Sequence, residues 1–174
     1  MKKLRETACT MLLSTALCTG MTVLPLQAAG GSYTLYRLYN PNTGEHLFTP
    51  RANEVYSLIS LGWRNEGKAW DAPEEGWYVY RMYNPNAGDH HYTMDENEKN
   101  VLISLGWKYE GVGWASPDLG WTPVKEADGD PIYRLYNPNA VTASHHYTGS
   151  VQEANALLRL GWKYEGVGWY SLRR

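Results

Sequence analysis

The sequence predicts a β-rich α+β fold built from three hairpin–helix–strand repeats. We expect these repeats to form a closed pseudo-threefold ring, propeller-like or trefoil-like. Two observations predict this fold. One motif begins three times, at Tyr36, Tyr80 and Tyr133. Within each copy the hydrophobic pattern changes from the alternation of a strand to the spacing of a helix, and then back again.

Each copy opens with a predicted β-hairpin. Tyr-Arg-Leu-Tyr or Tyr-Arg-Met-Tyr alternates as a strand does, Asn-Pro-Asn favours a turn, and His-x-Phe-Thr or His-x-Tyr-Thr forms the returning strand. In the third copy, Val-Thr-Ala-Ser at residues 141–144 replaces the Gly-Glu of the first turn.

A short helix is predicted after each hairpin. Asp95 with Glu98, and Ser150 with Glu153, have the spacing of a capping box, in which the cap oxygen and the carboxylate satisfy each other's free amides. Arg51 occupies the cap position of the first copy and predicts a weaker start there.

The apolar set Leu58, Ile59 and Leu61 is expected to face inward, as are its counterparts in the other copies. A glycine after each set predicts the end of the helix, because glycine enters the left-handed conformation without steric cost. These glycines are Gly62, Gly106 and Gly161. The motif Trp-x-x-Glu-Gly-x-x-Trp then predicts a turn and a further strand.

The N-terminal strand is expected to close the ring. Residues 32–35 precede the first copy in the register that residues 76–79 occupy before the second copy. We therefore expect this strand to complete the last repeat. Closure removes open sheet edges, which favour aggregation. An open three-unit solenoid is the alternative.

Residues 1–29 are predicted to be a secretory signal peptide, because basic residues precede an apolar stretch that ends in small residues. Interruptions leave this stretch short of the ~20 residues of a membrane span. Residues 30–174 then form a single domain, with repeats at about 33–76, 77–130 and 131–174. We expect a secreted, extracellular protein associated with the cell wall. Cys9 and Cys18 leave with the signal, so aromatic packing takes the place of disulfides.

The charge balance excludes one class of partner. The 174 residues include 16 basic and 18 acidic side chains, which lack the basic footprint of a nucleic-acid-binding protein. We predict no cofactor, no membrane partner once the signal is removed, and a monomeric state.

The combined motif of Tyr-Arg-Leu-Tyr-Asn-Pro-Asn, Gly-Glu-His-Leu-Phe-Thr, Leu-Gly-Trp and Glu-Gly-x-x-Trp resembles a family of uncharacterised secreted triple-repeat domains, a domain of unknown function. The resemblance covers residues 33–170. Members of that family occur on the surface of Gram-positive bacteria, often joined to cell-wall hydrolases and other extracellular enzymes. The resemblance implies an accessory, envelope-associated module and supplies no catalytic residue.

Histidine recurs at one hairpin position, as His46, His90 and His145. Three imidazoles near a threefold axis would suit a metal ion such as zinc. Hydrogen bonding of each histidine within its own hairpin turn explains the recurrence without that geometry. We favour this second interpretation and predict no metal site.

Glutamate recurs as Glu66, Glu110 and Glu165. Glycosidases use two carboxylates in unequal environments, whereas a symmetric repeat offers equivalent ones. A tight Glu-Gly turn also favours a structural hydrogen bond. We therefore predict no catalytic residue, although recurrent carboxylates keep a glycoside hydrolase among the alternatives.

Aromatic side chains are the remaining functional signal. Trp63 and Trp70, with their counterparts in the other copies, recur in every repeat and are predicted to lie in the core. Less uniform aromatic residues are candidates for an exposed platform that stacks on sugar rings. They are Trp77, Trp121, Tyr109, Tyr164 and Tyr170. The recurrent histidines and glutamates complete the predicted ligand-binding set, because they bond hydroxyl groups.

The sequence therefore favours a secreted, non-catalytic accessory module that binds peptidoglycan or another extracellular polysaccharide. Several weak sites on one body would gain avidity on a polymer. A protein-interaction or adhesion domain at the cell surface is the first alternative, and a glycoside hydrolase is the second.

Overall fold

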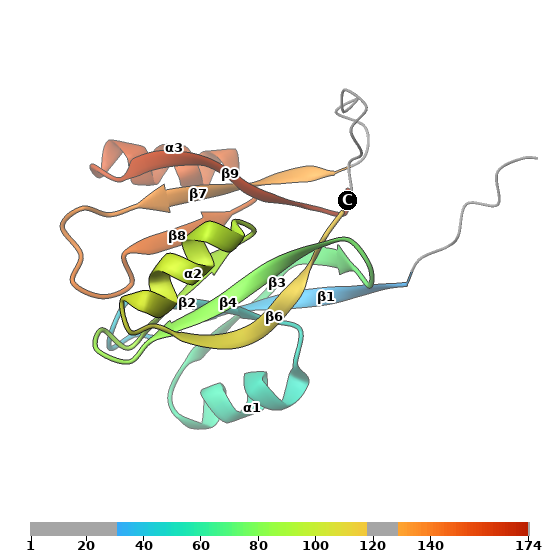
Figure 1. Ribbon diagram of the computed structural model, residues 1–174, viewed down its shortest axis with the longest axis horizontal. Helices are drawn as coiled ribbons and strands as arrows, with labels where there is room; N and C mark the ends of the chain where they lie inside the picture. Colours follow the sequence, from blue (N-terminus) through green and yellow to red (C-terminus); the bar gives the residue numbers. More distant parts are fainter. Residues whose placement is uncertain (1–30, 118–128, 174) are drawn as a thin grey trace, which may run out of the picture.

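The computed structural model describes residues 31–117 and 129–173. They form three units, each with a three-stranded antiparallel sheet and one helix (Figure 1). The first unit contains β1 (Ser32–Tyr39), β2 (His46–Thr49), α1 (Ala52–Ser60) and β3 (Arg64–Pro73). The second contains β4 (Trp77–Asn84), β5 (Asp89–Thr93), α2 (Glu96–Ser104) and β6 (Lys108–Ser116). The third contains β7 (Asp130–Tyr136), β8 (His145–Thr148), α3 (Val151–Arg159) and β9 (Lys163–Ser171). The predicted signal peptide, both cysteines and Trp121 lie outside the described residues.

The N-terminal strand does not complete the last repeat. Ser32 pairs with Pro73, so β1 forms the centre of the first sheet, between β2 and β3. The matching stretch of the third sheet comes from β7, where Asp130 pairs with Ser171. Residues 32–35 do form a strand in the expected register, as the start of β1. However, they pair within the first unit, and each unit supplies its own equivalent stretch. Among the described residues, the three sheets share no strand pairing and no closed barrel is found.

The predicted Glu-Gly turn is a bulge inside a continuous strand. The register between β1 and β3 skips Glu66, because Arg37 pairs with Gly67 and Leu38 pairs with Asn65. The registers of β6 and β9 skip the matching glutamates. A bulge re-aims the side chain of its extra residue. This local distortion turns each of these glutamates out of the regular alternation.

The predicted helix caps are present in two units. Asp95 accepts hydrogen bonds from two amides in the first turn of α2, and Ser150 accepts one in α3, whereas Arg51 provides no side-chain cap for α1. Each helix ends two residues before its predicted glycine, and these glycines have φ of 91°, 93° and 92°. In α1 the amides of Gly62 and Trp63 bond back to carbonyls of the last turn, as in a Schellman motif.

The expected inward apolar face of the helices is mostly wrong. Ile59 is 43% exposed and Leu61 is 72% exposed, whereas Leu58 is half-buried. A helix of nine residues presents one narrow face to its sheet, and Leu61 lies at the C-cap beyond that face. Within the described part of the chain, no helix is long and apolar enough to cross a membrane.

One aromatic core is shared by all three units. Trp70, Trp114 and Trp169 contact one another, with ring centroids 5.9, 5.8 and 5.2 Å apart. All three are buried, as predicted, but Trp63 and its counterparts are half-buried. A second set of buried rings packs against the tryptophans. These rings are Phe48, Tyr92 and Tyr147.

Candidate ligand-binding site

An arginine at the centre of each sheet links two glutamates. In the second unit, Arg81 Nε lies 2.7 Å from Glu110 Oε2 on the bulge of β6, and Arg81 Nη2 lies 2.7 Å from Glu54 Oε1 in α1. His90 Nε2 lies 3.3 Å from the same Glu110 oxygen. The matching arginines of the first and third units are Arg37 and Arg134.

The second glutamate of each arginine belongs to another unit. Arg81 contacts α1 of the first unit, Arg134 contacts Glu98 in α2, and Arg37 contacts Glu153 in α3. The same ion pair therefore recurs at all three interfaces between units. Each pair is partly shielded from water, which strengthens it relative to a surface ion pair.

These helix glutamates do not complete a capping box. The amide of Asp95 donates to Thr93 Oγ1 at 3.0 Å, and α3 repeats this contact. The carboxylate of Glu98 is therefore available to Arg134 of the next unit. A capping box and an ion pair with the next unit both require a glutamate at this position. The sequence spacing alone therefore did not distinguish the two roles.

The recurrent histidines all contact carboxylates, and in the described residues His145 alone also bonds within its own hairpin turn, where Nδ1 lies 3.1 Å from Ser144 Oγ. Nε2 of each lies 3.3 Å from the bulge glutamate of its own unit, which is Glu66, Glu110 or Glu165. They also do not gather at one axis. His46 packs on His146, with ring centroids 4.6 Å apart. In the described ranges, no group of three or more His, Cys, Asp or Glu residues is placed to hold a metal ion.

The pKa values of the three histidines are shifted in different directions. Burial lowers the pKa of His46 to about 3, and it does the same for His145, with help from neighbouring His146 and His91 respectively. Burial also opposes the charge of His90. However, hydrogen bonds to Glu110 and Glu45 raise the pKa of His90 above its ordinary value.

Three of the predicted aromatic residues are exposed. Trp77 on β4 is 57% exposed, Tyr109 on β6 is 44% exposed and Tyr164 on β9 is 52% exposed. Tyr170 is half-buried, and Trp121 lies outside the described residues. The exposed side chains therefore belong to the second and third units.

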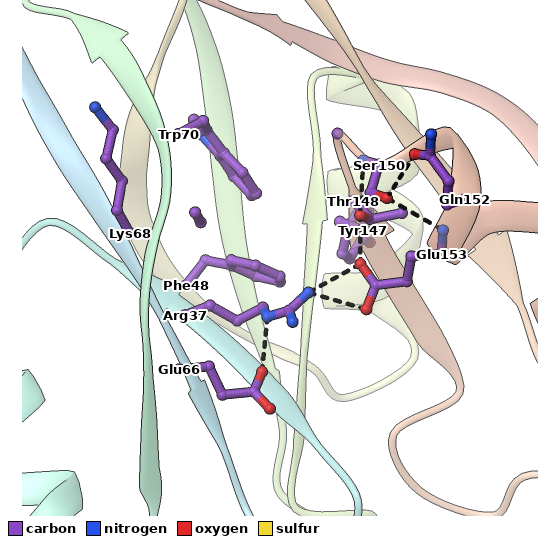
Figure 2. A pocket seen from close by; sticks show the side chains of 12 residues that line it. Arg37, Phe48, Glu66, Lys68, Trp70, Tyr147, Thr148, Ser150, Gln152 and Glu153 are labelled. Atoms are coloured by element: carbon purple, nitrogen blue, oxygen red, sulfur yellow. Dashed lines mark hydrogen bonds and ion pairs between the residues drawn. The ribbon is translucent and has the colours of Figure 1, made fainter. Parts of the chain in front are cut away.

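A pocket of about 420 Å³ opens between the first and third units (Figure 2). Phe48 and Trp70 of the first unit form one wall, and the corner that leads from β8 into α3 forms the opposite wall. Figure 2 shows Arg37 between Glu66 and Glu153, with its guanidinium beside the ring of Phe48. Arg37 Nε lies 2.7 Å from Glu66 Oε2, and Nη1 lies 3.0 Å from Glu153 Oε2.

The charges in this pocket suit binding. Burial alone would raise the pKa of Glu153, but the nearby His146, a hydrogen bond from Thr148 and the charge of Arg37 hold that pKa well below its usual range. Glu153 therefore accepts hydrogen bonds and does not supply a proton near neutral pH. The pocket combines an aromatic wall with donors and acceptors at fixed positions, which is typical of a site for a small polar molecule.

One protein-family model matches most of the chain. The family, described as a domain of unknown function (DUF5648), matches residues 34–172. The chain belongs to this family. No curated protein and no solved structure gives a match.

In this DUF5648 chain, Glu66 is the residue of the predicted ligand set that lines the pocket. Sequence reasoning missed Arg37, Phe48 and Glu153. The signal was present in the repeats, because Phe48 stands where the other copies have tyrosine. This substitution affects a binding pocket only because the first unit packs against the third.

Proposed function

We propose that this protein is a secreted, non-catalytic module that binds a cell-wall or other extracellular polysaccharide. The observation that carries the proposal is a pair of exposed tyrosines at the same position of two units. Tyr109 packs on Tyr80, with ring centroids 6.0 Å apart, and Tyr164 packs on Tyr133 at 6.2 Å. An exposed ring can stack on the apolar face of a sugar, and repetition on one body favours a polymer.

We also propose that the three units form a closed pseudo-threefold ring. Two observations support this arrangement. The arginine–glutamate ion pair recurs at all three interfaces, and the three core tryptophans contact one another in every pairing. A ring would hold Tyr109 and Tyr164 at a fixed spacing, which suits a ligand with a repeating structure.

The carboxylates of the ion-pair networks favour binding over hydrolysis. A hydrogen bond from His90 is the largest influence on Glu110, and together with Arg81 it lowers the pKa of Glu110 to about 2. The pKa of Glu98 is also lowered, because hydrogen bonds from His91 and Arg134 outweigh its burial. A glycosidase needs one carboxylic acid that stays protonated near its working pH.

A protein-interaction or adhesion domain is the second candidate. Leu61, Leu105 and Leu160 are each at least 67% exposed at the ends of the three helices. Repeated exposed leucines would suit an apolar protein surface.

The experiment is a pull-down of the purified protein with peptidoglycan, teichoic-acid-bearing walls and insoluble glucans, while released soluble sugar is measured. We expect retention on at least one polymer, competition by soluble fragments of that polymer, and no product. The double variant Tyr109→Ala/Tyr164→Ala should lose most of the retention. Tyr56→Ala is the matched control, because Tyr56 is 71% exposed on α1 of the first unit.

The outcomes separate the three functions. No retention of the wild-type protein on any polymer would overturn the polysaccharide proposal and favour a protein partner. Released sugar would instead favour the hydrolase.

A further inference from the structure

We propose that the pocket between the first and third units is a specific subsite for one neutral sugar residue, so that the chain carries one such subsite and not three. This inference rests on the proposed function and deepens it. It adds a ligand contact at one interface to the exposed tyrosines of the second and third units. The other two interfaces serve as internal controls, because equivalent residues meet there.

A tyrosine hydroxyl seals the other two interfaces. Between the first and second units, the hydroxyl of Tyr92 accepts a hydrogen bond from the amide of Phe48 at 3.1 Å and donates to its carbonyl at 3.3 Å. Between the second and third units, Tyr147 makes the same two contacts with the backbone of Tyr92, at 3.1 and 2.9 Å.

The third interface lacks this hydroxyl, because Phe48 takes the place of the tyrosine. In residues 31–117 and 129–173, no side-chain hydroxyl bonds to the backbone amide or carbonyl of Tyr147. Tyr147 lies in β8, an edge strand that lines the pocket. An edge strand carries a donor and an acceptor that can pair with another molecule. The missing hydroxyl therefore leaves a place for the hydroxyl of a ligand.

One corner of the pocket also differs between the units, although a Cβ atom added at Gly149 would lie 3.3 Å from Ile132 Cδ1. At the corner between the second strand and the helix, the third unit has Gly149, where the first has Pro50 and the second has Met94. Gly149 lines the pocket of about 420 Å³. This volume falls within the range of about 300–1,000 Å³ that is typical of small-molecule sites.

The Nη2 group of Arg37 is not used for the ion pair that Nη2 makes in Arg81 and Arg134. Arg81 and Arg134 each place Nη2 2.7 Å from a helix glutamate of another unit. Arg37 instead uses Nη1 for both oxygens of Glu153, at 3.0 Å each. No ion pair or hydrogen bond of Arg37 Nη2 is found in the described part of the chain. The side chain of Arg37 is also the most exposed of the three, at 26%, compared with 8% for Arg81 and 19% for Arg134.

The balance of charge disfavours an anionic ligand. Glu66 and Glu153 share the charge of Arg37, and Lys68 is paired with Asp71. An anionic sugar would therefore meet no unpaired positive charge in the pocket. An uncharged sugar ring can instead lie against Phe48 and exchange hydrogen bonds with Arg37, Glu66 and the Tyr147 backbone.

The first test maps binding by amide NMR. The probes are neutral β-1,4- and β-1,3-linked gluco-oligosaccharides and oligomers of N-acetylglucosamine, added to the purified protein. We expect one pocket site per chain, with shifted amides at Lys68, Tyr147 and Gly149, in addition to any shifts around the exposed Tyr109 and Tyr164. Equivalent amides at the sealed interfaces, those of Tyr92 and Met94, should not shift.

The second test gives the third interface the hydroxyl that the other two already carry. Phe48→Tyr supplies this hydroxyl and should weaken binding of the oligosaccharide at least ~10-fold. Tyr92→Phe is the matched control, because it removes the equivalent hydroxyl from the interface between the first and second units and should not weaken binding in this pocket. Circular dichroism and thermal unfolding would confirm that each variant is folded.

The outcomes distinguish failure of the subsite from failure of the function. If the wild-type protein binds, but the shifts appear only around Tyr109 and Tyr164 and the Phe48→Tyr variant binds equally well, the subsite is wrong and the polysaccharide function stands. If the wild-type protein binds none of these probes and none of the polymers, both proposals are overturned.

Discussion

Ala143 shows how one residue can carry strain that its counterparts avoid. It is the one non-glycine residue among the described ones with a positive φ, of 53°. The equivalent turn positions in the first and second units are Gly44 and Gly88, with φ of 80° and 71°. A Cβ atom in this left-handed region costs roughly 1–2 kcal/mol. The longer hairpin loop of the third unit therefore holds a conformation that favours glycine.

Replacing Ala143 by glycine should stabilise the protein. Relief of the left-handed strain exceeds the extra freedom that glycine gives the unfolded chain, so we expect Ala143→Gly to raise the free energy of unfolding by about 0.5 kcal/mol. Chemical denaturation measures this change. Ala140→Gly, in the same loop but without a positive φ, should lower the free energy of unfolding. Changes of the same sign in both variants would contradict the assignment of strain to Ala143.

At the scale of elements, the three helices share their length and their final glycine but differ in how they begin. Asp95 and Ser150 satisfy amides in the first turns of α2 and α3, whereas Arg51 leaves the first turn of α1 without a side-chain cap. At an uncapped helix start, the amides of the first turn bond to water instead of to a capping side chain. The first unit therefore has the least stabilised helix start.

Introducing a cap should strengthen α1. We expect Arg51→Ser to raise the free energy of unfolding by about 0.5–1 kcal/mol, because serine can accept a bond from an amide in the first turn, as Ser150 does in α3. Ser150→Ala should lower it by a similar amount. Thermal unfolding measures both changes. If Ser150→Ala destabilises the protein while Arg51→Ser has no effect, other contacts already hold the start of α1.

Local signals explain why these elements were predictable from the sequence. The hairpins, the two capped helices and the glycine stops each depend on residues within a few positions of one another. The partner of Glu98 was not predictable in the same way, because Arg134 belongs to another unit. The Glu-Gly bulge was mistaken for a turn, since a positive φ at glycine serves both structures.

At the scale of the whole molecule, the units repeat in sequence but are not equivalent in space. Phe48 and Gly149 each look like an ordinary substitution within its own copy. They meet only because the first unit packs against the third, and together they line a pocket that the other interfaces lack the features to form. The shared tryptophan core was predictable from recurrence, but this pocket depends on differences between copies that lie far apart in the chain.

The unequal histidines predict how stability depends on pH. His46 and His145 have folded pKa values of about 3, against 6.5 in the unfolded chain. The unfolded chain therefore binds more protons below pH 6.5, and the stability due to these neutral histidines is lost as the pH falls from 6.5 towards 3. His90 acts in the opposite sense, because its raised pKa adds stability below pH 6.5 that is lost as the pH rises through the folded value.

Two histidines outweigh one, so the protein should lose about 3 kcal/mol of unfolding free energy between pH 7 and pH 5. Urea denaturation at a series of pH values measures this slope. His46→Gln/His145→Gln should flatten it, because glutamine does not titrate, and His90→Gln should make it steeper. A second loss should follow below pH 4.5, where Glu110, with its pKa lowered to about 2, becomes protonated more readily in the unfolded chain. A wild-type protein with equal stability at pH 7 and pH 5 would show that the buried histidines are not held neutral, and that the interfaces between units are more open to water than the structure describes.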